Sequence, residues 1–136
     1  MTGTRRKART IALQALYEID SVGRETGAVV KRFLAEGDLS EENKTFVHEL
    51  VDGIIRNRDE IDRSIQRFAP AWPIEQIAII DRNILRLAIF EILFDNKVPV
   101  KVAISEAVEL AKSFGSENSA RFVNGVLGSV SSLASR

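Results

Sequence analysis

The sequence predicts an all-helical fold of about seven helices. Apolar side chains recur at helical spacing along almost the whole chain, and no segment alternates apolar and polar residues as a half-buried strand would. The breaks between these apolar stretches are short and contain glycine, proline or a helix-capping residue. Because no linker is long enough to separate independent domains, we expect residues 1–136 to form a single domain.

Three helices are expected before Asn57. The first helix should end near Gly23 and has one apolar stripe, formed by Ala8, Ile11, Ala12, Ala15, Leu16 and Ile19. A weaker helix covers about residues 25–36. Ser40 then suits the N-cap of the third helix, since two glutamates follow it in the first turn, where the helix dipole favours acids.

The remaining helices are expected after Asn57. The segment 77–94 is apolar on nearly every side, which predicts a central helix with neighbours around most of its surface. The apolar stripe of the last helix is expected to continue to Leu133 and Ala134. The other helix boundaries are marked by three kinds of residue. Pro70, Pro73 and Gly115 each end a helix, and Pro99 precedes one. Ser116 is expected to cap the last helix.

The composition excludes several classes of protein. An apolar content of 45% with 28% charged residues is typical of globular rather than disordered chains. No window is apolar enough to span a membrane, and the N-terminus lacks the apolar core of a secretory signal. The absence of cysteine excludes disulfides and thiolate metal sites, which fits a cytoplasmic protein.

Nothing in the sequence indicates an enzyme. The single histidine, His48, lies in the middle of an expected helix, where it is typical of a surface or edge residue. Glu106 and Glu109 lie three residues apart, but together with Lys112 they indicate a solvated, charged helix face. Glycine-rich phosphate loops, nucleophile–histidine–acid sets and metal-ligand spacings are absent, so we expect no cofactor and no metal.

The first helix begins with a basic cluster, Arg5, Arg6, Lys7 and Arg9, in a chain whose net charge is zero. Such a cluster can be merely solubilising, but its geometry favours a polyanionic ligand. Arg5 and Arg9 lie one helical turn apart, where like charges repel each other and oppose the dipole. Phosphates would relieve this conflict, which predicts nucleic-acid binding at this end of the chain.

Leu13 and Tyr17 form an apolar pair outside the narrow stripe of the first helix. Two interpretations are open. The helix buries a wider arc, or the pair is an exposed patch for a partner protein, in which tyrosine is a favoured anchor.

The last helix places Asn118 and Phe122 on one edge of its stripe, with Arg121 beside them. An aromatic ring next to these polar groups suits single-stranded RNA, because bases stack on the ring and amides bind base edges. Phe122 could equally be peripheral core. Gly125 is costly in a helix interior, which indicates that a ligand or a neighbouring helix approaches its backbone closely.

Three stretches together resemble the NusB family of bacterial transcription antitermination factors. They are RRKARTIALQALY at 5–17, ILRLAIFEI at 84–92, and the long segment at 98–128 that contains VPVKVAI, EAVELAK and FVNGVLG. The resemblance implies two perpendicular three-helix bundles with one extra helix. It also implies binding of the boxA element of nascent ribosomal RNA together with NusE, a ribosomal small-subunit protein, in a complex that helps RNA polymerase to read through terminators.

Matched position by position, the resemblance implies roles for individual residues. Arg5, Arg6, Lys7 and Arg9 match the arginine-rich RNA-binding motif of the family, and Asn118 and Phe122 match its RNA-facing part of the last helix. Tyr17 and Asp81 match positions at the NusE interface. With the neighbours identified above, the expected RNA-binding set also includes Arg121, and the expected NusE-binding set also includes Leu13.

Two alternatives remain open at this point. A NusB-like domain also precedes the catalytic domain of ribosomal RNA cytosine methyltransferases, and this reading would require the sequence to be a fragment, since no cofactor-binding unit follows. The chain could also be a helical protein-interaction module without an RNA role, which could form a homodimer through Leu13 and Tyr17.

Overall fold

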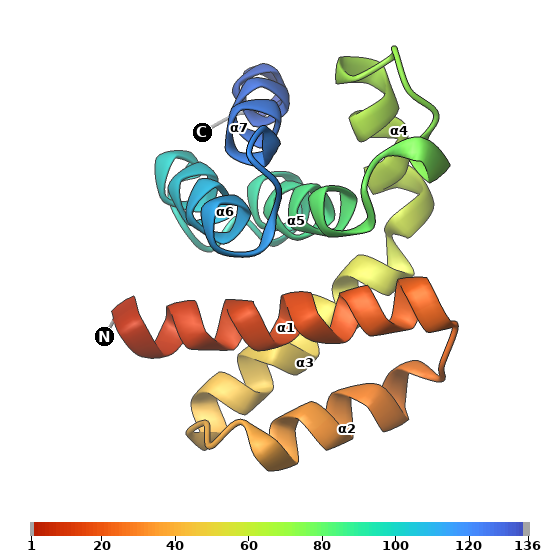
Figure 1. The fold of residues 1–136 in the computed structure, drawn as a ribbon. Helices are drawn as coiled ribbons and strands as arrows, with labels where there is room; N and C mark the ends of the chain where they lie inside the picture. The colour runs from red at the N-terminus through yellow and green to blue at the C-terminus, as the bar shows by residue number, and fades with distance from the viewer. Residues whose placement is uncertain (1, 135–136) are drawn as a thin grey trace. The chain divides into compact units, whose positions relative to one another are not determined.

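The computed structural model describes residues 2–134, which form seven α-helices and three short helical turns without any strand (Figure 1). This confirms the predicted all-helical class. The contacts divide the chain into two compact units, one up to Arg56 and the other from Asn57 onward. The single domain over 1–136 therefore stays a prediction. Among the described residues, no helix combines the length and apolarity that a membrane crossing needs.

The first unit contains α1 (Thr2–Val22), α2 (Thr26–Glu36) and α3 (Glu41–Arg56), and α1 packs on both of the others. All three helices lie where the apolar periodicity predicts them. Ser40 is the predicted N-cap of α3, since its hydroxyl oxygen accepts a hydrogen bond from the amide of Asn43 at 3.2 Å. The expected stripe of α1 is buried at five of its six positions, namely Ala8, Ile11, Ala12, Ala15 and Leu16.

A glutamate rather than a serine or an aspartate caps α2. The Glu25 carboxylate accepts hydrogen bonds from the amides of Gly27 at 2.9 Å and Ala28 at 2.8 Å, and these bonds hold the pKa of Glu25 below its ordinary value of 4.5.

Because this pKa is lowered in the folded protein, the stabilisation by the cap is present above pH 4.5 and is lost as the pH falls through the lowered pKa. We expect the protection factors of the α2 amides, which are the intrinsic exchange rates divided by the observed ones, to fall over that range. Glu25→Gln should remove this pH dependence, and an unchanged pH profile in the variant would contradict the assignment.

The second unit is built around α5 (Ile79–Ile89), which packs against helices on several sides. Its contacts with α4, α6 and α7 confirm the prediction of a central helix. The other elements of this unit are α4 (Arg58–Phe68), η1 (Ile74–Gln76), the π-helical turn η2 (Phe90–Asp95), α6 (Val100–Phe114), α7 (Ser119–Val130) and η3 (Ser131–Leu133).

The central helix differs from the prediction at its start. It begins at Ile79 because Ile77, with φ −74° and ψ 135°, is still extended. After Ile89 the helix widens into η2, where the amide of Asn96 bonds to the carbonyl of Glu91, five residues earlier. Asn96 then adopts a left-handed conformation with φ 55° and ends the helix at the predicted place.

The last helix also differs from the prediction. Ser116 is not its N-cap, because α7 begins only at Ser119 and Asn118 occupies the N-cap position. The Ser119 hydroxyl instead accepts a hydrogen bond from the amide of Ser116 at 2.8 Å, which closes the preceding turn. The expected stripe ends at Val130, and Leu133 is exposed in the following turn η3.

A buried ion pair ties α4 to α5. The Arg86 guanidinium, only 3% exposed, donates two hydrogen bonds to the Asp62 carboxylate, at 2.8 Å from Nε and 3.0 Å from Nη2. A third bond, from Nη1 to the side-chain oxygen of Asn83, measures 3.2 Å. This planar, two-pronged geometry is the strong form of an ion pair, and it joins α4 to α5, the two helices on either side of residues 69–78.

Candidate nucleic-acid interface

The basic cluster lies in the first two turns described for α1, and its members differ in exposure. Arg6 and Lys7 are exposed, and Arg5 is partly buried. Arg9 is only 3% exposed. Burial to this degree does not favour direct contact of Arg9 with a phosphate, and its role as an RNA ligand stays a prediction.

Arg5 and Arg9 lie along the edge of α1 that faces α3, and both contact the ring of Phe46. The guanidinium carbon lies 4.0 Å from the ring centroid for Arg5 and 5.4 Å for Arg9. Glu42, one turn earlier on α3, places a carboxylate oxygen 3.6 Å from Nη2 of Arg5. The repulsion between the two arginines is therefore offset inside the protein by a π-face and an acid.

The apolar pair of α1 has two different environments. Leu13 is fully buried, which the wider buried arc explains, and its contact with a partner protein stays a prediction. Tyr17 is 43% exposed, as the partner-surface interpretation requires.

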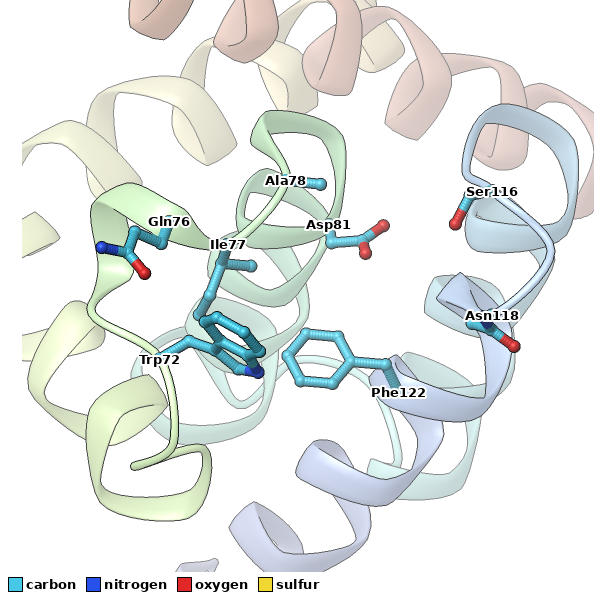
Figure 2. A pocket seen from close by; sticks show the side chains of 8 residues that line it. All are labelled: Trp72, Gln76, Ile77, Ala78, Asp81, Ser116, Asn118 and Phe122. Atoms are coloured by element: carbon cyan, nitrogen blue, oxygen red, sulfur yellow. The ribbon is translucent and has the colours of Figure 1, made fainter.

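An open pocket of about 260 Å³ lies in the second unit (Figure 2). It brings together three of the residues that the sequence singled out, Asp81, Asn118 and Phe122. Its other lining residues are Trp72, Gln76, Ile77, Ala78 and Ser116. Because pockets for drug-sized ligands typically measure about 300–1,000 Å³, this pocket suits one small group, such as a base or a single side chain.

Two polar side chains position the loop that carries Trp72. The amide nitrogen of Gln66 donates to the carbonyl of Trp72 at 2.7 Å, and its amide oxygen accepts from the backbone of Ile74 at 3.0 Å. Arg82 donates to the carbonyls of Ile74 and Ile77 at 3.3 Å each. The backbone of the loop is thus tied to α4 and α5, although Trp72 itself is 57% exposed.

Asp81 gives the pocket its charge. It lies in the first turn of α5, where the helix dipole favours a carboxylate. Its Oδ1 atom is buried and has no hydrogen-bond partner in the part of the chain that the structure describes. Figure 2 shows this carboxylate pointing toward the Ser116 side of the pocket, which Trp72 and Phe122 also line. An unpaired buried acceptor is costly, so a donor supplied by a ligand would be stabilising there.

The residues that the sequence singled out on α7 differ in exposure. Arg121 is exposed and Phe122 is half-buried. A Cβ atom added at Gly125 would meet no described atom within 4 Å, so close approach of a neighbouring helix is not the reason for this glycine. His48 is exposed, as predicted, and the described residues contain no group of three or more potential metal-ligating side chains.

Sequence reasoning missed Trp72, Phe46 and Glu42. The WP dipeptide after Phe68 was a usable signal for an exposed aromatic in a turn, since proline excludes a helix there. No comparable signal existed for Phe46 and Glu42, which occupy ordinary positions of an amphipathic helix.

Comparison with known proteins identifies relatives over nearly the whole chain. A family model described as the NusB family matches residues 6–132. A transcription antitermination protein NusB from Dehalococcoides mccartyi (strain CBDB1) is 59% identical over 131 residues, covering 96% of this chain and 92% of the relative. One from Roseiflexus sp. (strain RS-1) is 48% identical over 132 residues, covering 96% and 93%.

Solved structures agree with the sequence relatives. A structure of NusB from T. maritima superposes with a TM-score of 0.90 at 32% identity, covering 97% of this chain and 93% of that one. A crystal structure of the antitermination factors NusB and NusE in complex with double-stranded RNA superposes with a TM-score of 0.89 at 28% identity, covering 98% and 99%.

Proposed function

Since this chain belongs to the NusB family of transcription antitermination proteins, we propose that it binds the boxA element of nascent ribosomal RNA together with NusE. The complex would promote read-through by RNA polymerase in the cytoplasm. The curated relatives are named for antitermination and not for a catalytic activity. A solved relative was crystallised with both NusE and RNA, which supports the two ligands proposed for this chain.

The pocket of the second unit is the observation that carries this proposal. Two residues expected to face RNA, Asn118 and Phe122, line the same small pocket as Asp81, which is expected to face NusE. RNA and protein would therefore meet at one site. A donor from NusE would pair the buried Asp81 oxygen, while a base would stack on the exposed aromatic surface.

The exposed end of α1 would supply the positive charge that binds the RNA phosphates. Arg6 and Lys7 are exposed and Arg5 is partly so, and these three residues form the proposed phosphate-binding set. Tyr17 is proposed as a further NusE contact and Arg121 as a further RNA contact, since both are exposed.

Salt titration tests the proposal directly. A short boxA-like RNA is titrated with and without NusE at several salt concentrations, and we expect weak binding alone and clear enhancement by NusE. Lys7→Ala and Arg6→Ala should each make the dependence of log affinity on log salt concentration shallower by about 0.7, the value for one phosphate contact of a single strand.

Lys31→Ala is the matched control, because Lys31 is an exposed lysine on α2, outside the cluster, and its loss changes the net charge equally. Equal effects of Lys31→Ala and Lys7→Ala would indicate only a general charge effect. Binding that is independent of salt, or absent with both components present, would contradict the proposed function and favour a protein-interaction module.

A further inference from the structure

The end of α1 and the edge of α3 together hold one arginine in a defined position. Arg5 lies on the face of Phe46, 4.0 Å from the ring centroid, with Glu42 at 3.6 Å from its Nη2 atom. Its Nη1 atom is buried and has no hydrogen-bond partner in the described part of the chain. The aromatic ring therefore compensates one side of the guanidinium, and the other side is directed to an acid.

Phe46 also restrains the residue one turn further along. Arg9 lies 5.4 Å from the same ring centroid and is buried, so its guanidinium contacts α3 at Phe46 as well. With both guanidinium groups on a single ring, the direction of the Arg5 side chain depends on α3 and not on α1 alone. A free arginine on a helix end would sample many rotamers, and ordering it on binding would cost entropy.

We propose that α3 completes the RNA-binding surface, with Phe46 as the positioning residue of Arg5 and Glu42 as the acid that an RNA phosphate displaces. The proposal rests on the RNA-binding function proposed above and adds two residues that neither the sequence pattern nor the family resemblance indicated.

Glu42 is suited to displacement rather than to a permanent ion pair. Its side chain is 84% exposed, and its distance of 3.6 Å from Arg5 exceeds that of a hydrogen bond. A phosphate carries a full charge and oxygens that match the planar fork of arginine, so it competes well for the same edge. In the free protein Glu42 would hold the guanidinium in place and lower the affinity for RNA slightly.

The first test is a double-mutant cycle on Glu42. Glu42→Gln should tighten binding of a boxA-like RNA by about two- to five-fold, the range of an exposed ion pair. When Arg5 is also replaced by glutamine, Glu42→Gln should change the RNA affinity no more than Glu41→Gln does. Glu41→Gln is that control, because Glu41 precedes Glu42 on α3, pairs with Lys44 at 3.4 Å and carries the same charge.

Equal effects of Glu42→Gln and Glu41→Gln, or an effect of Glu42→Gln that persists without Arg5, would overturn the role of Glu42. The cycle isolates the local competition because both variants change the net charge by the same amount.

The second test is the salt dependence of Phe46 variants. Phe46→Leu removes the π-face and keeps apolar volume, and it should lower the RNA affinity and flatten the salt slope as Arg5→Gln does. Phe46→Tyr keeps an aromatic ring and should retain the affinity and the slope of the parent protein. If Phe46 is purely structural, Phe46→Leu should lower the melting temperature and leave the salt slope unchanged, and this result would overturn the proposal.

The two proposals can fail separately. If RNA binding does not respond to Lys7→Ala either, the proposed function itself is wrong. If it responds to Lys7→Ala and not to Phe46→Leu, only the role of α3 is wrong.

Discussion

Asp62→Ala should lower the free energy of unfolding by about 3–5 kcal/mol, because it removes the carboxylate that accepts two hydrogen bonds from the buried guanidinium of Arg86. Small proteins have total stabilities of about 5–15 kcal/mol, so the loss is a large fraction. Urea denaturation monitored by circular dichroism measures this loss of stability, provided that the dependence of the free energy of unfolding on urea concentration keeps the same slope in the variant.

Two variants make this experiment specific. Glu60→Ala removes an exposed acid from the same helix and should change the stability by less than about 1 kcal/mol. The double variant Asp62→Leu with Arg86→Met should recover most of the loss, since apolar residues of similar volume can replace a buried ion pair. A loss below about 1 kcal/mol in Asp62→Ala would show that the pair does not stabilise the contact between α4 and α5.

Phe122→Ala should weaken the binding of boxA-like RNA in the presence of NusE by about 1–3 kcal/mol, the usual contribution of a base stacked on an aromatic ring. Because the ring carries no charge, the salt slope should stay that of the parent protein. This combination distinguishes the pocket from the basic cluster, where a substitution flattens the slope.

Phe114→Ala is the matched control for this measurement. Phe114 is another aromatic residue of the second unit, 41% exposed at the end of α6, but it does not line the pocket. Its replacement should leave the RNA affinity unchanged. Equal losses in both variants, or none in Phe122→Ala, would contradict the assignment of the pocket to RNA.

The helical periodicity predicted most of the fold because burial of one apolar stripe is a local property of sequence spacing. It placed the helices of the first unit and the central position of α5 correctly. It failed at Ser116 and at the start of α5, where the competing turn geometries differ little in energy and the surrounding contacts select one of them.

The basic cluster shows where sequence reasoning stops. The spacing of Arg5 and Arg9 correctly indicated an unfavourable pair of charges on one edge of α1. Bound phosphates were expected to offset the repulsion between the two arginines, yet Phe46 and Glu42 already offset it within the fold. A wheel projection of one helix contains no information about the side chains that a second helix brings to its edge.

The sequence by itself determined the helical class, the family and the presence of a basic cluster, because periodicity, motif and charge are all recorded along the chain. Only the tertiary structure decided that Arg9 and Leu13 are buried, that Arg5 is held by α3, and that Asp81 shares a pocket with Phe122. Exposure and pairing depend on residues far apart in sequence, which only packing brings together.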